Sequence, residues 1–242
     1  MSKRKLAFFH SPVLFLISLF IPILIVAVYL VYRGNNHTAS RSFRLRYWLR
    51  EPQAHQDWAV KAGDRCANAP FSIPTDGYIG FLWGDSFYLG HTHQGIDIFG
   101  GAAENTTPII AAYGGFLTHL YDWKSSVIIR IPDDPLHPGR QIWTYYTHMA
   151  SSEGDSYINP DFPPGTSELF VEQGTLLGYQ GNYSGAPGNP TGIHLHFSIV
   201  LDDGQGGFRN ELEFKNTLDP SPYLGIQLNT ATKPDEVPIC KN

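Results

Sequence analysis

The chain has 242 residues, of which 16% are charged, and its net charge at neutral pH is −5. This length is enough to bury a substantial core, and the acidic balance gives no reason to expect nucleic acid as a partner. Glycine (24), proline (18) and aromatic residues (14%) are plentiful, which favours many short strands joined by tight turns over long surface helices.

The first predicted element is a membrane-spanning helix at residues 13–32, "VLFLISLFIPILIVAVYLVY", which holds no charged residue. Its length matches the bilayer's hydrocarbon core, about 30 Å at about 1.5 Å per residue. A cleaved signal peptide is the alternative, but its apolar region is usually ~7–15 residues long and ends in small residues. Tyr29, Tyr32 and Arg33 stand at this end instead. We therefore expect an uncleaved anchor behind a short cytoplasmic tail, residues 1–12.

The side of the membrane on which the rest of the chain lies is not settled by charge. Basic residues precede the predicted anchor, but several arginines also follow it, and the two groups favour opposite orientations. Cys66 and Cys240 offer a second indication, because a disulfide between them would stabilise the chain by roughly 4–5 kcal/mol and imply an oxidising, extracytoplasmic compartment. Two unrelated thiols remain the alternative.

Beyond the anchor, the sequence divides into two parts. Residues 33–65 lack sustained apolar periodicity and predict a juxtamembrane stalk. Residues 66–242 contain short β-branched and aromatic runs bounded by Gly, Pro, Asn or Asp, and these predict one antiparallel all-β domain, a barrel or a sandwich. Two long loops, 132–140 and 150–168, are placed where substrate walls are often built.

The first motif that suggests chemistry is "HTHQGIDIF", residues 91–99, in which His93 and Asp97 are four positions apart. In a straight strand their Cα atoms would be about 13 Å apart, slightly too far for one metal ion to bridge. A bend or bulge at Gly95 would bring them into range. His91 forms a second pair with His93 but lacks the four-residue spacing to Asp97.

The second motif is "GIHLHF", residues 192–197, which places His194 and His196 on the same face of a strand, about 6.6 Å apart. Such a pair could reach one metal ion or be two half-buried rings on a strand. Two imidazoles and one carboxylate are the usual ligands of a catalytic zinc. The chain has no HExxH motif with its glutamate base, so another group must move protons, and His148 in "YYTHM" is a candidate.

Taken together, these motifs resemble the LytM/lysostaphin-type zinc metallopeptidases, which cleave peptide bonds in bacterial peptidoglycan. "HQGID" (93–97), "YTHM" (146–149) and "HLHF" (194–197) occur in the family's order, with supporting segments "TPIIAAYGG", "VEQGTLLGYQG" and "LDPSPYLG". The resemblance covers about residues 70–226. It implies a lysostaphin-like antiparallel β barrel-sandwich, in agreement with the strand pattern.

The resemblance also distributes roles among the candidate residues. It implies that His93, Asp97 and His196 bind Zn²⁺, and that His148 and His194 are catalytic histidines that do not bind the metal. The loops that contain residues 132–140 and 150–168 look lengthened relative to the family, which affects substrate specificity. No cofactor beyond zinc is expected.

Other polar and aromatic residues are expected to be ordinary. Tyr88 is a weak candidate for contacting a transition-state oxyanion, and Tyr145 and Tyr146 are expected to be strand residues, one of them facing the core. The remaining histidines are expected to be surface or membrane-flank residues: His10, His37, His55, His119 and His137.

The sequence thus predicts a single-pass, membrane-anchored zinc endopeptidase that acts on peptidoglycan peptides outside the cytoplasmic membrane. The alternative is a non-catalytic LytM-like regulator or binding protein that acts on other wall hydrolases, although members of that kind typically lose ligand residues. A wall glycosidase with a carboxylate pair would explain none of the histidines. The bond that is cleaved, the oligomeric state and any protein partner are not specified by the sequence.

Overall fold

The computed structural model describes residues 21–22, 24–26, 41–88 and 90–240. Most of this part of the chain is β-structure. The strands are β1 (Ala59–Val60), β2 (Gly77–Phe81), β3 (Ile96–Phe99), β4 (Pro108–Ile110), β5 (Gly115–Thr118), β6 (Val127–Ile131), β7 (Ile142–Thr147), β8 (Leu169–Val171), β9 (Leu176–Tyr179), β10 (Gly181–Tyr183), β11 (Pro190–Leu201) and β12 (Thr217–Leu218). From residue 41 onward the helical segments are residues 41–50, η1 (Pro52–Trp58), η2 (Phe214–Asn216) and α2 (Ser221–Leu224).

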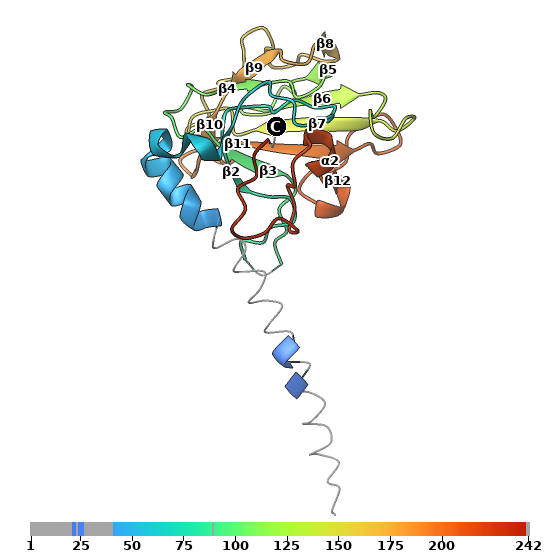
Figure 1. Ribbon diagram of the computed structural model, residues 1–242. Coiled ribbons are helices and arrows are strands. Elements are labelled where there is room, and N and C mark those ends of the chain that lie inside the picture. Colours follow the sequence, from blue (N-terminus) through green and yellow to red (C-terminus); the bar gives the residue numbers. More distant parts are fainter. Residues whose placement is uncertain (1–20, 23, 27–40, 89, 241–242) are drawn as a thin grey trace, which may run out of the picture.

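Strand β11 is the centre of the larger of two sheets. The order of that sheet is β1-β2-β3-β11-β7-β6-β5-β8, with β10 and β12 also paired to β11, and β4 and β9 form a separate small sheet (Figure 1). Among the strands of the described residues, every pairing is antiparallel. The all-β, antiparallel fold predicted from the short apolar runs is therefore confirmed.

One hydrophobic core joins the two sheets. Leu195 and Phe197 of β11, Ile98 of β3, Ile109 of β4 and Leu177 of β9 are all fully buried in a single cluster. Alternate residues of β11 point to the opposite face, because successive side chains of a strand project from opposite sides. The two histidines of this strand lie on that other face, where the sheet forms a cleft.

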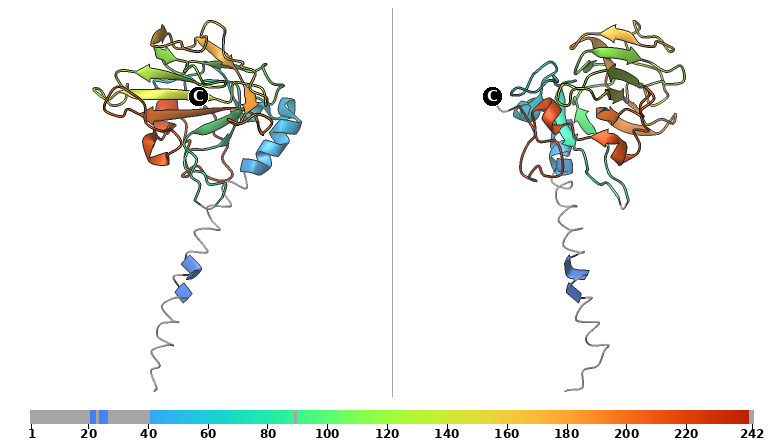
Figure 2. Two further views of the ribbon diagram at one scale, coloured as in Figure 1. Left: turned by 180° about the vertical axis from the view of Figure 1, so that it is seen from behind. Right: turned by 90° about the vertical axis from the view of Figure 1, so that its right-hand side faces the viewer.

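Residues 41–60, which the sequence assigns to the stalk, pack on the body of the protein (Figure 2). Trp48 of helix 41–50 is 1% exposed and clusters with Tyr78 and Phe99 of β2 and β3. Its indole Nε1 donates a hydrogen bond to the carbonyl of Phe99 at 2.7 Å. Strand β1 then pairs with β2. The division at residue 65 into stalk and peptidase domain stays a prediction.

The predicted anchor, residues 13–32, lies mostly outside the described residues, as does the predicted tail, residues 1–12. Where the structure is described, it contains no helix that is both long enough and apolar enough to cross a bilayer. The membrane anchor stays a prediction.

Cys66 and Cys240 form a disulfide, with their Cα atoms 5.0 Å apart. The bond links the start of the predicted domain to the C-terminal segment across 174 residues of sequence. Of the two alternatives for these cysteines, the structure supports the bridge.

His119 corrects one expectation. It is 2% exposed rather than on the surface, and its ring nitrogens lie 2.7 Å from the carbonyl oxygen of Phe162 and 2.8 Å from that of Trp123. An imidazole has two polar atoms at opposite edges, so it can connect two loops that are distant in sequence. His137 is exposed and His55 is partly buried, while His10 and His37 lie outside the described residues.

Candidate active site

The register between β3 and β11 brings two of the predicted ligands together. Asp97 lies directly opposite His196 in the antiparallel pair, between the neighbouring pairs Ile98–Leu195 and Ile96–Phe197. Side chains opposite one another on the same face of such a pair have Cβ atoms about 4.5–5.5 Å apart. A carboxylate and an imidazole at these positions can therefore reach a common point.

His93 reaches the same point because the chain bends just before β3. The strand begins at Ile96, and Gly95 is a bend, as the spacing of His93 and Asp97 predicts. A Cβ atom at Gly95 would lie 2.2 Å from the carbonyl oxygen of Phe197. Glycine is needed here because the backbone of this bend passes close to β11.

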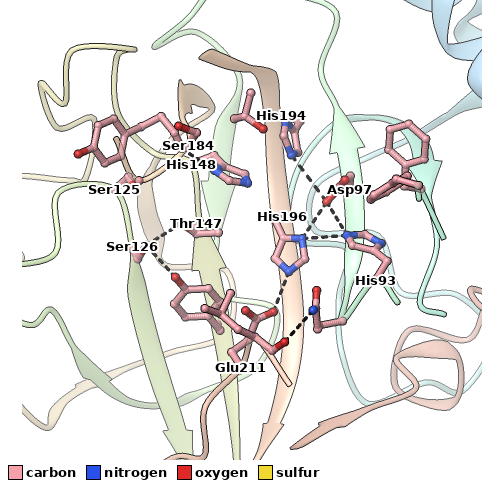
Figure 3. Close-up of a pocket in the computed structure, with 18 of the residues that line it drawn as sticks. His93, Asp97, Ser125, Ser126, Thr147, His148, Ser184, His194, His196 and Glu211 are labelled. Carbon is pink, nitrogen blue, oxygen red and sulfur yellow. Dashed lines mark hydrogen bonds and ion pairs between the residues drawn. The ribbon is translucent and has the colours of Figure 1, made fainter. Parts of the chain in front are cut away.

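Three atoms of these residues form a compact triangle (Figure 3). His93 Nε2 lies 3.1 Å from Asp97 Oδ1 and 3.1 Å from His196 Nδ1, and the remaining pair, His196 Nδ1 and Asp97 Oδ1, is 2.8 Å apart. In a tetrahedral zinc site with ligands at about 2.0–2.2 Å, two ligand atoms are roughly 3.3–3.6 Å apart. The donor set and the size of the triangle fit a zinc ion held by these three residues.

The outer nitrogen of each histidine in the triangle also has a partner. His93 Nδ1 lies 3.0 Å from the carbonyl oxygen of Leu82, and His196 Nε2 lies 2.9 Å from Glu211 Oε1. A carbonyl and a carboxylate both accept hydrogen bonds, so each ring can donate through its outer nitrogen and turns the inner one to the triangle. Glu211 was not predicted, because it lies in a loop 15 residues after His196 with no motif around it.

Electrostatics couple the members of the triangle. Burial favours the neutral forms, but the carboxylates of Glu211 and Asp97 outweigh it and raise the pKa of His196 to about 10. For Asp97, burial by itself would raise the pKa, but His93, His194 and His196 hold that pKa well below its usual range. The centre therefore contains a carboxylate that stays ionised, as a metal ligand must be.

His148 lies beside the triangle at the end of β7. Its backbone φ of 73° is in the left-handed region, which residues other than glycine rarely adopt. Its Nδ1 lies 2.6 Å from the carbonyl oxygen of Tyr183, and its ring centroid is 4.5 Å from that of His194. Burial and the nearby imidazoles of His194 and His196 lower the pKa of His148 to about 3, so the ring is neutral at physiological pH.

His194 projects from the same face of β11 as His196. Its Nδ1 lies 2.8 Å from the carbonyl oxygen of Gly192, and its Nε2 lies 3.7 Å from Asp97 Oδ1. Burial lowers the pKa of His194 despite the nearby Asp97 carboxylate. The structure thus brings all five predicted site residues into one group, with His194 and His148 adjacent to the triangle of His93, Asp97 and His196.

This group lies in a cleft of about 550 Å³. Hydroxyl groups line it on one side and phenylalanine rings on the other: Ser125, Ser126, Tyr145 and Thr147, and Phe81, Phe87 and Phe99. Tyr145 faces the cleft while Tyr146 is fully buried, as expected for neighbours on a strand. The weak candidate Tyr88 is 68% exposed and does not line the cleft, and neither do the long loops 132–140 and 150–168.

Comparison with solved structures finds peptidase domains of low similarity. The catalytic domain of lysostaphin from Staphylococcus simulans is 21% identical, with 62% of this chain and 89% of that chain covered and a TM-score of 0.38. A variant of the catalytic domain of the prophage-encoded M23 protein EnpA from Enterococcus faecalis is 24% identical, with 60% and 96% covered and a TM-score of 0.37. A solution structure of lysostaphin is 21% identical, with 71% and 54% covered and a TM-score of 0.37.

No protein-family model and no curated protein matches the chain. The solved structures carry the names of the family that the three motifs resemble.

Proposed function

We propose that this protein is a zinc metalloendopeptidase that hydrolyses peptide bonds of bacterial peptidoglycan. The observation that carries the proposal is the convergence of three motifs, distant in sequence, on one cleft. Each motif position is occupied by the residue type that the chemistry requires. A non-catalytic regulator on the same fold would need none of these side chains to meet, so the intact group favours the enzyme.

In this proposal the metal is held by His93 Nε2, Asp97 Oδ1 and His196 Nδ1, the three atoms of the triangle. Zinc at such a site lowers the pKa of water to about 7 and polarises a carbonyl group. The outer contacts with the Leu82 carbonyl and the Glu211 carboxylate keep both imidazoles in the tautomer that metal binding needs.

His148 and His194 then move protons. Each donates its Nδ1 proton to a backbone carbonyl, of Tyr183 and Gly192 respectively, which leaves Nε2 free to accept a proton. Because the pKa of His148 is lowered to about 3, its ring is an unprotonated base at the start of the reaction. A pair of such groups can accept the proton of the attacking water and return it to the leaving amine.

The substrate class follows from the resemblance, and the lining of the cleft is compatible with it. The hydroxyls of Tyr145, Ser126 and Thr147 form a connected group, with Tyr145 donating to Ser126 Oγ at 3.0 Å and Ser126 Oγ lying 2.6 Å from Thr147 Oγ1. Such groups can hydrogen-bond the amides of an extended peptide, while the phenylalanine rings opposite provide apolar contact.

We place the catalytic domain outside the cytoplasmic membrane, anchored by residues 13–32. The substrate exists only there, and the disulfide of Cys66 and Cys240 belongs in an oxidising compartment.

Two measurements on the purified full chain test the proposal. Incubation with peptidoglycan, followed by mass spectrometry, should reveal new amino termini, and the metal content should be one zinc per chain. His196→Ala should lose both zinc and cleavage, whereas His137→Ala, an exposed histidine outside the cleft, should keep both. Full zinc occupancy in His196→Ala would contradict the ligand assignment, and zinc binding without any new amino termini would favour the regulator.

A further inference from the structure

A buried ion pair links helix 41–50 to the segment that carries His93. The guanidinium of Arg41 donates through Nη2 to Asp85 Oδ1. The side chains of Arg41 and Asp85 are 0% and 2% exposed. Burying two charges has a large desolvation cost, so a fully buried ion pair outside the cleft indicates a specific structural role.

Asp85 connects this pair to a tight turn, residues 82–85. Its second carboxylate oxygen, Oδ2, accepts a hydrogen bond from the backbone N–H of Leu82 at 2.8 Å. Its own N–H donates to the Leu82 carbonyl at 3.1 Å. The carboxylate thus closes the turn from one side while Arg41 holds the carboxylate from the other.

The same turn holds His93 at three points. The N–H of His93 donates to the carbonyl of Asp85 at 2.7 Å, and the N–H of Gly84 donates to the carbonyl of His93 at 2.8 Å. The third point is the ring, whose Nδ1 lies 3.0 Å from the Leu82 carbonyl oxygen. The Leu82 carbonyl oxygen therefore contacts both the N–H of Asp85, which closes the turn, and Nδ1 of the His93 ring.

We infer that Arg41 is a positioning residue of the metal centre, acting through Asp85 and the 82–85 turn to orient His93. This rests on the proposed function, because it takes His93 as a zinc ligand. It means that the centre depends on helix 41–50, which precedes the first of the three motifs by more than 40 residues. Outer contacts that orient metal ligands typically contribute 10–100-fold to metal affinity.

The test is the zinc dissociation constant of the full chain, measured by competition with a chelator. Arg41→Gln should raise this constant by about 10–100-fold. Arg41→Lys keeps the charge but not the shape of the guanidinium, and it should give a smaller rise. Because Arg41→Gln leaves Asp85 buried without its partner, it is also expected to lower the melting temperature. If it does not fold, the result is read from Arg41→Lys.

Arg44→Gln is the matched control. Arg44 holds the same helix to the carbonyls of Pro234 and Asp235 and makes no contact with the turn, so its loss should lower the melting temperature and leave zinc affinity unchanged. Cobalt in place of zinc adds a second readout, because its ligand-field spectrum should change in the Arg41 variants and not in the control.

The outcomes separate this inference from the proposed function. If the wild-type chain does not bind zinc, the proposed function fails. If the wild type binds zinc and the folded Arg41 variants bind it equally well, with an unchanged cobalt spectrum, Arg41 has a purely structural role and the inference is overturned.

Discussion

At the residue scale, each histidine of the cleft has its two ring nitrogens in different surroundings. His93, His148 and His194 each place Nδ1 against a backbone carbonyl, whereas His196 places Nε2 against Glu211 and turns Nδ1 inward. The outer partner decides which nitrogen carries the proton, and hence which is available to a metal or a substrate. His194 and His196 are two residues apart on one strand, yet they turn different ring nitrogens toward the cleft because their outer partners differ.

His148→Ala should retain zinc and lose most turnover. His148 is not one of the three residues whose ligand atoms converge on one point, and its Nδ1 is held by the Tyr183 carbonyl. General acid–base groups contribute about 10²–10⁴-fold to rate. Metal content and the rate of peptide release from peptidoglycan measure the two effects separately. His91→Ala is the control, since His91 lies near His93 but does not line the cleft. Wild-type rates in His148→Ala would show that the proton-transfer role is wrong.

Glu211→Gln should weaken zinc binding by about 10–100-fold, because an amide holds the His196 tautomer less well than a carboxylate does. Chelator competition measures the change. Glu213→Gln is the matched control, because Glu213 is exposed and pairs with Lys215 away from the site. Equal zinc affinity in the two variants would mean that the Glu211 contact does not orient His196.

At the scale of elements, the site depends on how closely β3 and β11 approach. Asp97 and His196 are opposite one another only in the observed register, and a shift by one residue would turn one side chain to the other face. The bend at Gly95, which passes close to Phe197, sets where this register begins.

Gly95→Ala should therefore affect both stability and metal binding. Its Cβ would lie 2.2 Å from the Phe197 carbonyl oxygen, and relieving such overlap in a packed region typically costs about 1–3 kcal/mol. Urea unfolding and zinc titration provide the measurements. Gly114→Ala serves as control, because the nearest atom to its Cβ would be 3.4 Å away. A Gly95→Ala protein as stable as the control would refute the close-approach argument.

The long loop 132–140 does not line the cleft. Hydrogen bonds to the buried carboxylate of Asp134 hold this loop in place. Asp134 accepts hydrogen bonds from the Leu136 N–H, the Arg140 guanidinium and the Tyr223 hydroxyl. Burial alone would raise the pKa of Asp134, but these donors outweigh it and lower the pKa below 3.8. A lowered folded-state pKa stabilises the protein above the unfolded-state value, and that stability is lost as the pH falls through the folded-state pKa.

Asp134→Asn should accordingly destabilise the protein by about 1.5–3 kcal/mol at neutral pH, the usual contribution of hydrogen bonds to a charged group. The difference from wild type should shrink as the pH falls below the unfolded-state pKa and through the lowered folded-state pKa, where the wild-type carboxyl also becomes neutral. Unfolding by urea at neutral and acid pH tests this. A difference that does not vary with pH would show that charge is not the cause.

At the scale of the whole molecule, helix 41–50 and the C-terminal segment pack on the same body. Helix 41–50 packs on β2 and β3, and the disulfide joins Cys66 to the C-terminal segment. Arg44 of the helix also donates to carbonyls of residues 234 and 235. Helix 41–50 therefore contacts both the C-terminal segment, through Arg44, and the 82–85 turn that holds His93, through Arg41.

The topology that we propose predicts that protease added to intact spheroplasts digests residues 40–242. A C-terminal reporter that works only outside the cytoplasm should be active. Protection of the domain until the cells are lysed would overturn the orientation and, with it, the proposed substrate.

What the sequence by itself determined is local. The alternation of β11 puts two histidines on one face, the spacing of His93 and Asp97 requires a bend at Gly95, and the motif order indicates which residues meet. Tertiary structure alone decided that Glu211 contacts His196, that Arg41 contacts Asp85 and that His119 is buried. Each of these depends on a loop path or on contacts that span 15 to 44 residues. No periodicity or motif encodes such contacts, because they arise only when the sheet has formed and its loops have packed.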